Sequence, residues 1–130
     1  MIVIDASVVV ELLTNLAVAP HLQARLDTET LIAPDILPVE VASALRGLNR
    51  SGHLTDNDLE IARDDLLRLP IGLHPSLPLI PLVLALRSNF SAYDASYVVL
   101  AEAFQCPLLT LDQRLAKAAR KYCDVEVPEG

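Results

Sequence analysis

Four acidic residues lie at places in the sequence where a helix is expected to begin, and together they could bind a metal ion. Asp5 and Asp112 each follow a short apolar run that predicts a strand, whereas Glu40 and Asp94 fall in the first turns of predicted helices. In an α/β sheet the helices begin at the carboxyl ends of the strands, where ligand crevices form. We therefore expect these four carboxylates to share one edge of the fold.

Carboxylates that share one edge repel one another, so some of them must be protonated or neutralised by cations. The first lysine in the chain is Lys117, which makes a divalent metal ion the natural partner of these acids. Ligand sets made only of oxygen atoms select Mg²⁺ or Mn²⁺ rather than Zn²⁺. A metal ion held in this way would activate water for attack on a phosphodiester and neutralise charge on the leaving oxygen.

Each acid, taken alone, also has a structural explanation. Asp is a common N-cap residue, so Asp5 or Asp112 could simply cap the helix that follows it. Glu40 could complement the dipole of its helix from the surface. Asp94 lies three residues after Ser91, which is the spacing of a capping box. Position alone therefore leaves a metal site and ordinary helix capping as alternatives.

The elements that must position the acids alternate between strands and helices. We predict strands at residues 1–4, 31–33, 71–73 and 107–111, with a further edge strand at 125–127. We predict helices at residues 6–13, 19–26, 37–50, 55–69, 78–87, 91–104 and 113–121. This order predicts an α/β domain with a mainly parallel sheet of four to five strands, flanked by helices. We expect residues 1–130 to form a single domain.

Apolar residues make up 52% of the chain, and the mean hydropathy is +0.40, which is high for a soluble domain. Tyr97, Leu100, Ala101 and Phe104 recur at helical spacing, so we predict that this face of their helix is buried. The surplus of apolar side chains predicts a surface that a partner or a second copy covers. We expect no membrane helix, because several prolines interrupt the longest uncharged run, residues 69–86. Cys106 and Cys123 are too few and too far apart for a disulfide framework or a C-x-x-C motif, so we expect buried thiols in a cytoplasmic protein.

The net charge of −7 argues against tight nonspecific binding to nucleic acid through the whole surface. Local basic strips remain on the helices that begin near Glu40 and Asp112, and these strips consist of Arg46, Arg50, Arg114, Lys117, Arg120 and Lys121. We predict that Arg46, Arg114 and Lys117 contact a nucleic-acid backbone. The other three lie nearer the helix C-termini and are explained as complements of the helix dipoles.

Four sequence motifs surround the four acids, and the residue types in these motifs add to what the positions of the acids indicate. They read IVIDASV at residues 2–8, PVEVASAL at 38–45, YDASYV at 93–98 and LTLDQRL at 109–115. Together they resemble the PIN-domain family, and within it the VapC toxins of toxin–antitoxin pairs. The resemblance covers essentially the whole chain, with the motifs in the same order. It implies a three-layer PIN-like α/β fold and an Mg²⁺- or Mn²⁺-dependent endoribonuclease.

The resemblance also implies roles for individual residues and partners for the chain. The metal-binding and catalytic acids would be Asp5, Glu40, Asp94 and Asp112, and these would be supported by Ser7 after the first acid and Thr110 before the last. The substrate would be RNA, with tRNA and rRNA as candidates. The partners would be a second copy of the chain and a VapB-like antitoxin that occupies apolar grooves.

Other functions remain open at this stage. Metal-dependent phosphodiester hydrolysis does not use the 2′-hydroxyl as nucleophile, so the four acids fit a DNA nuclease as well as a ribonuclease. A PIN-like domain could also serve only as a binding module, although four intact acids argue against this. A phosphoacceptor receiver domain would need a lysine near its phosphorylation site, and none precedes Lys117.

Overall fold

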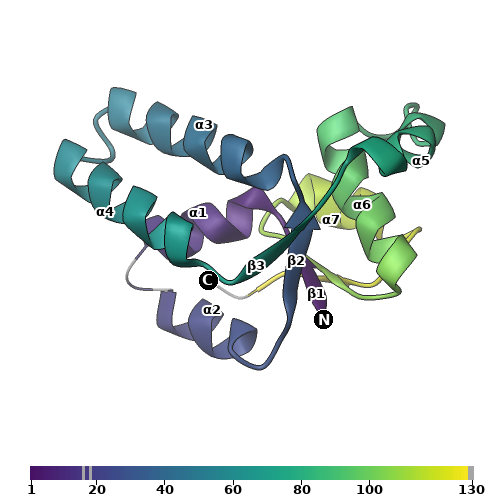
Figure 1. Ribbon diagram of the computed structural model, residues 1–130, viewed down its shortest axis with the longest axis horizontal. Helices are drawn as coiled ribbons and strands as arrows, with labels where there is room; N and C mark the ends of the chain where they lie inside the picture. Colours follow the sequence, from purple (N-terminus) through teal and green to yellow (C-terminus); the bar gives the residue numbers. More distant parts are fainter. Residues whose placement is uncertain (16, 18, 129–130) are drawn as a thin grey trace.

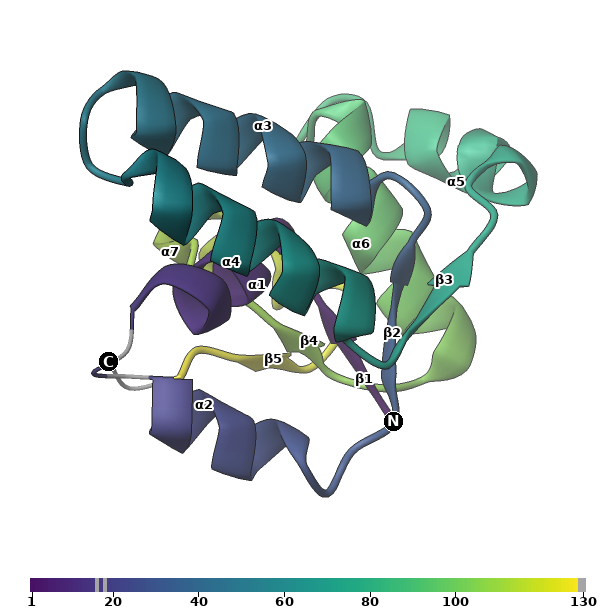
Figure 2. The same cartoon turned by 60° about the vertical axis from the view of Figure 1, so that its left-hand side comes forward.

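The strand β1 (Ile2–Ile4) lies at the middle of the sheet, and all three of its side chains are completely buried. The computed structural model describes residues 1–15, 17 and 19–128. Within these residues the sheet has five parallel strands in the order β3-β2-β1-β4-β5 (Figure 2). The other strands are β2 (Leu31–Pro34), β3 (Ile71–His74), β4 (Leu108–Leu109) and β5 (Val125–Glu126).

Helices cover both faces of this sheet, which gives three layers (Figure 1). In the described ranges the helices are α1 (Ala6–Thr14), α2 (Ala19–Leu26), α3 (Leu37–Arg50), α4 (Asp56–Arg68), α5 (Ile80–Ala85), α6 (Ala92–Phe104) and α7 (Gln113–Ala119), with a 3₁₀ turn at Leu77–Leu79. Helix α6 packs against β1, β2 and β4 on one face and is joined there by α5. Helix α1 lies on the other face and contacts α2, α3 and α4. The predicted three-layer α/β fold is therefore confirmed.

Helix α6 is the most deeply enclosed helix of the fold. Every residue from Ala95 to Ala101 is buried, because the helix is held between the sheet on one side and α5 with the 3₁₀ turn on the other. A helix that is apolar on nearly all sides requires such an environment. At its start the Ser91 hydroxyl accepts a hydrogen bond from the Asp94 amide at 3.1 Å, as the capping spacing predicts. The packing of α6 therefore fixes the position of Asp94.

Several details differ from the expectations set by the sequence. Phe104 was predicted to be buried, and this was wrong: it is 40% exposed and lies edge-on to the His74 ring, 4.7 Å between centroids. The last strand before α7 is only Leu108–Leu109, although the Thr110 amide still donates to the Glu126 carbonyl at 3.1 Å. The predicted helix at residues 78–87 is divided into the 3₁₀ turn and the short α5. No helix in the described part of the chain is long and apolar enough to cross a bilayer.

The order of the strands determines where a site can form. The chain runs outward from β1 to β2 and β3, and then returns to place β4 on the other side of β1. The connections that leave β1 and enter β4 use α1 and α6, which lie on opposite faces of the sheet (Figure 1). Such a reversal opens a crevice at the carboxyl ends of the two neighbouring strands. Asp5 and Asp112 follow those two strand ends.

Candidate metal centre

Asp5 is the most enclosed acid of the candidate site and is only 5% exposed. Its Oδ1 accepts hydrogen bonds from the Ser7 hydroxyl at 2.5 Å and from the Val8 amide at 3.2 Å. Its Oδ2 accepts a hydrogen bond from the Thr110 hydroxyl. Asp5 is therefore the N-cap of α1, as its sequence position predicts, and it also bonds a residue that follows β4. Since a carboxylate offers about four lone-pair positions, the three donors leave Oδ2 able to accept one more partner.

The two hydroxyl groups that hold Asp5 are themselves held by the backbone after β4. The Ser7 hydroxyl accepts a hydrogen bond from the Leu111 amide at 3.0 Å, and the Thr110 hydroxyl accepts one from the Asp112 amide at 3.0 Å. Because each hydroxyl also donates to Asp5, its proton direction is fixed. Ser7 and Thr110 thus orient Asp5 and join the end of β1 to the start of α7.

Glu40 lies in the first turn of α3 and is half-buried. Its Oε1 accepts a hydrogen bond from the Tyr97 hydroxyl at 2.6 Å, and Tyr97 is only 2% exposed. Burial raises the pKa of Tyr97, and the nearby Glu40, Asp5 and Asp94 charges raise it further. Tyr97 therefore stays protonated and acts as a fixed donor to Glu40. The sequence analysis missed this role, because the helical spacing of Tyr97 indicates only a core position.

Asp94 and Asp112 lie at the open side of the site. They line one cavity of about 460 Å³, together with residues of α7 and of the loop before α6. Asp112 caps α7, where its Oδ1 accepts hydrogen bonds from the Arg114 and Leu115 amides at 3.0 and 3.2 Å. Asp94 is half-buried, and Asp112 is exposed. These two acids can therefore move toward a ligand more freely than Asp5.

The electrostatics of the site show that the four acids are close enough to affect one another. Burial raises the pKa of the Asp5 carboxyl, and the Asp112 charge raises it further. The three hydrogen bonds to this carboxyl lower its pKa but do not cancel the increase. Burial also raises the pKa of Glu40, and the Asp94 and Asp5 charges add to this effect. The pKa of Asp94 is raised by burial and then by the Asp112 charge, while Arg114 acts in the opposite direction. The four acids therefore form a ring in which each carboxylate repels two neighbours, as expected from their shared edge.

This ring has the donor chemistry that a hard divalent cation requires. All four donors are carboxylates, and Glu40 Oε2, Asp112 Oδ2 and both Asp94 side-chain oxygens accept no hydrogen bond from the described residues. Across residues 1–15, 17 and 19–128, however, no three acid, histidine or cysteine side chains already meet at one point. The residues fit Mg²⁺ or Mn²⁺ by charge and ligand type, and binding would require the side chains to draw together.

The basic residues that the sequence singled out lie in two different places. Arg114 and Lys117 line the cavity that contains Asp94 and Asp112. Arg46 instead lines a groove of about 550 Å³ between α3 and α4, which contains none of the four acids. Of the three residues predicted to contact a nucleic-acid backbone, the structure therefore places Arg114 and Lys117 in the same cavity as two of the acids.

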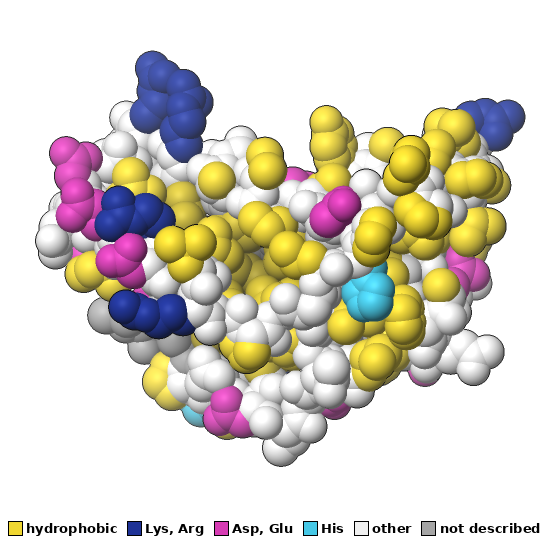
Figure 3. Space-filling view, in the orientation of Figure 1, with side chains coloured by type: hydrophobic (Ala, Val, Ile, Leu, Met, Phe, Trp, Pro, Cys, Tyr) yellow, Lys and Arg dark blue, Asp and Glu magenta, His cyan; other side chains and the backbone are white. Residues whose placement is uncertain are grey.

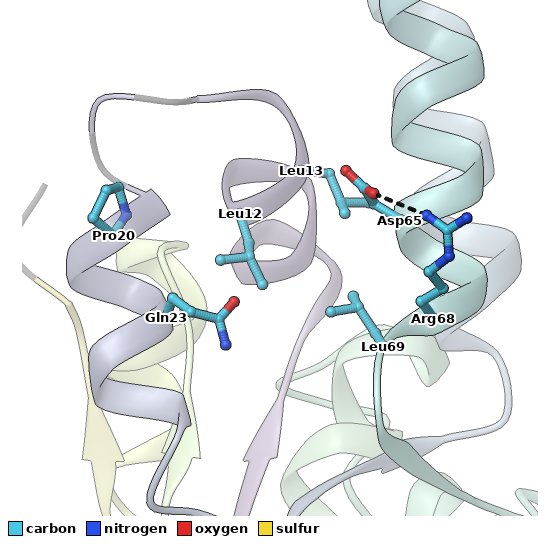
Figure 4. Close-up of a pocket in the computed structure, with 7 residues that line it drawn as sticks. All are labelled: Leu12, Leu13, Pro20, Gln23, Asp65, Arg68 and Leu69. Carbon is cyan, nitrogen blue, oxygen red and sulfur yellow. Dashed lines mark ion pairs between the residues drawn. The ribbon is translucent and has the colours of Figure 1, made fainter.

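A further cavity, of about 470 Å³, lies between α1, α2 and the end of α4 (Figure 4). Its walls include Leu12, Leu13 and Leu69, and an ion pair at 3.9 Å joins Arg68 to Asp65 at its side. Its cation is therefore already partnered, and none of the four acids lines this cavity. It has no evident part in the chemistry of the metal centre.

Comparisons with known proteins agree with this arrangement. The sequence model of the family described as PIN domain matches residues 2–121. The chain therefore belongs to the PIN-domain family. It is 39% identical to "VapC ribonuclease Mb0985" of Mycobacterium bovis over 98% of each chain, and 34% identical to "Ribonuclease VapC12" of Mycobacterium tuberculosis at the same coverage. The crystal structure of PAE2754 from Pyrobaculum aerophilum has the same fold, with a TM-score of 0.69 and 23% identity over 95% of this chain and 89% of that one.

The repulsion in this PIN-domain site predicts a pH-dependent change in stability. The pKa of Glu40 is raised in the folded protein, so its contribution to stability is present below about pH 4 and is lost as the pH rises through the folded pKa. Gln at this position cannot ionise, yet its Oε1 can still accept the Tyr97 hydroxyl. We expect Glu40→Gln to raise the melting temperature of the metal-free protein by about 3 °C at pH 7 and to change it little at pH 4.

Thermal unfolding followed by circular dichroism in the presence of a chelator measures this difference. Glu60→Gln, on the exposed side of α4, is the matched control and should leave the melting temperature unchanged at both pH values. An equal shift for Glu40→Gln at pH 4 and pH 7 would show that the charge of Glu40 is not its cause.

Proposed function

We propose that this chain is a metal-dependent endoribonuclease that hydrolyses RNA phosphodiester bonds with Mg²⁺ or Mn²⁺, as the toxin of a type II toxin–antitoxin pair. The observation that supports it best is the ring of mutually repelling carboxylates at the reversal of the sheet. When bound, a divalent ion supplies Lewis-acid activation of water and neutralises charge on the leaving oxygen. The curated relatives named as VapC ribonucleases support RNA as the substrate.

The four acids would hold the ion in two distinct ways. Asp5 and Glu40 form a fixed half, because Ser7, Thr110 and Tyr97 restrain their carboxylates by hydrogen bonds. Asp94 and Asp112 form an adjustable half at the mouth of the cavity. A fixed half gives the ion a defined position, and an adjustable half allows the ligands to close around it.

Two other functions would use the same fold. A DNA nuclease could use the same four acids, since none of them reads the 2′-hydroxyl. A binding module without catalysis would have no use for three carboxyls whose pKa values are raised against their ionisation. Perturbed acids of this kind are typical of functional sites, which favours catalysis.

Cleavage by the purified protein tests the proposal. We expect Mn²⁺ or Mg²⁺ to support cutting of one or more RNAs from a panel of tRNAs and rRNA fragments, and a chelator to abolish it. Asp94→Asn removes one adjustable carboxylate and should lower the rate by about 100-fold. The substrate control is a single-stranded DNA of matched sequence, and the products are resolved on a denaturing gel.

The outcomes of this experiment separate the alternatives. Cutting of RNA that needs metal and Asp94 supports the proposed ribonuclease. Cutting of DNA alone would refute RNA as the substrate but would still support a metal-dependent nuclease. If nothing is cut and calorimetry detects no metal binding, the chain is better explained as a binding module.

Tyr97 provides a second test, directed at the fixed half of the site. Tyr97→Phe removes the hydroxyl that donates to Glu40 and keeps the packing of the ring in the core. We expect the affinity for Mn²⁺, measured by calorimetry, to fall by about 10-fold. Tyr93→Phe, on the same helix but 62% exposed, is the matched control. Equal Mn²⁺ affinities for the two variants would exclude a role for Tyr97 in supporting Glu40.

We further propose two protein partners, a second copy of this chain and a VapB-like antitoxin. Exposed apolar side chains gather over α5 and the segments beside it (Figure 3), and they comprise Leu73, Leu77, Ile80, Leu82, Leu84 and Phe104. Patches of this kind mark protein interfaces, and we assign this one to the homodimer. The groove between α3 and α4, with Leu45, Leu59 and Leu66 in its walls, offers a separate site for an antitoxin segment.

The dimer can be tested by light scattering after size exclusion. We expect the chain to be a dimer at micromolar concentration and Leu82→Glu/Leu84→Glu to be a monomer, since the new charges would be buried in the contact. Leu67→Glu, at a position on α4 that is 80% exposed, controls for the effect of charge on the surface and should remain a dimer. A monomeric wild-type protein would refute this partner.

A further inference from the structure

The cavity beside the metal centre combines acids with basic residues. It has a volume of about 460 Å³, and Asp94 and Asp112 form one part of its lining. Arg114, Lys117 and Lys121 form another part, which comes from α7 and the turn that follows it. Two of the four acids therefore share a cavity with three of the ten basic residues of a chain whose net charge is −7.

These three basic residues are available to a ligand. Arg25, Arg63 and Arg68 elsewhere in the protein form ion pairs with carboxylates at 2.8 to 3.9 Å. Among the residues that the structure describes, the side chains at 114, 117 and 121 form no ion pair, and all three are exposed. The cavity also contains both lysines of the chain. Within the described ranges, no ion pair therefore neutralises these three charges.

The cavity is a built feature rather than a gap between mobile segments. The Asn89 side-chain amide donates to the Tyr122 hydroxyl at 3.4 Å, and the Phe90 ring meets the Tyr122 ring edge-on at 5.6 Å. These contacts join the loop before α6 to the turn after α7 and thus connect two walls of the cavity. On α7, Asp112 accepts the Arg114 amide, which fixes the turn from which the basic residues extend.

The charges in this cavity favour a backbone ligand over a base. Phe90 is only 9% exposed, so it offers no open ring face for a base to stack on. The Asn89 amide already bonds Tyr122. Beside Asp94 and Asp112, the cavity presents three positively charged side chains, which recognise phosphate without regard to sequence. The groove that contains Arg46 differs, because none of the four candidate metal ligands lines it.

We propose that this cavity is the subsite for the phosphate backbone of RNA next to the bond that is cut, with Arg114, Lys117 and Lys121 contacting the phosphates. The proposal rests on the ribonuclease function proposed above. In this proposal Lys121 contacts the substrate and is no longer explained as a complement of the helix dipole. The reason is that α7 ends at Ala119 and Lys121 lines the cavity beyond that end. The phosphate to be cut would face the acids, and its neighbour would face the basic residues.

The test compares variants that remove the same charge in different places. Lys117→Gln and Lys121→Gln remove one charge each from the cavity, and Lys121→Arg keeps it. Arg50→Gln removes one charge from the far end of α3 and is the matched control, since Arg50 is exposed and forms no ion pair within the described ranges. Binding of a fluorescent single-stranded RNA is measured by anisotropy in a chelator, at several salt concentrations, and cleavage kinetics are measured with Mn²⁺.

We expect each lysine variant to lower the slope of log Kd against log salt concentration by about 0.7, the value for one phosphate contact on a single strand. We expect KM for RNA to rise by about 10-fold in Lys117→Gln/Lys121→Gln with kcat changed less than about 2-fold, since the contacts serve binding rather than chemistry. Lys121→Arg and Arg50→Gln should behave as the wild type.

Each outcome bears on the subsite separately from the ribonuclease. If the wild type cuts RNA and the lysine variants match Arg50→Gln in slope and KM, the subsite is refuted and the ribonuclease stands. If no RNA is cut but binding still depends on Lys117 and Lys121, the backbone subsite is supported and the ribonuclease is refuted. An equal lysine dependence with single-stranded DNA supports contacts to phosphate and places the choice of RNA elsewhere.

Discussion

The candidate site depends on one buried carboxylate, that of Asp5, at the end of the central strand. A charge in this position is strongly disfavoured unless donors surround it, and Ser7, Thr110 and the Val8 amide supply three. Thr110 follows β4, so the same hydrogen bonds that satisfy Asp5 hold the ends of two neighbouring strands together. Since the Asp112 amide donates to the Thr110 hydroxyl, the start of α7 is fixed by the same network.

This network explains why the acids differ in character although they share one edge. Asp5 and Glu40 have donors that come from distant parts of the chain, and these donors limit their movement. Among the described residues, Asp112 accepts hydrogen bonds from local backbone amides alone, as the N-cap of α7, and Asp94 lines the same cavity. The raised pKa values show that hydrogen bonding alone does not offset the burial and crowding of these charges. A divalent cation would relieve that imbalance, which is why the geometry favours a metal centre over four separate helix caps.

Much of this could be predicted from the sequence, because the relevant signals are local. Apolar runs followed by Asp or by Pro predicted the strand ends and helix starts, and parallel strands then placed the four acids at one edge. Contacts between distant elements could not be predicted in the same way. Tyr97 has the spacing of a core residue, and only the approach of α3 to α6 reveals its bond to Glu40. Phe104 has the same spacing, but it is the last residue of α6, where the helix is no longer enclosed by its neighbours. Its side chain is therefore 40% exposed.

The distribution of charge adds a condition on how a polyanion could reach these acids. A protein with a net charge of −7 repels nucleic acid at a distance, and four clustered carboxylates would repel a phosphate more strongly at close range. Arg114, Lys117 and Lys121, which form no ion pair with a described residue, place positive charge on the α7 side of the site. A strand would therefore approach from α7, and a bound cation would be needed before its phosphate could pass to the acids. Substrate and metal would in this way favour each other's binding, because each neutralises charge that opposes the other.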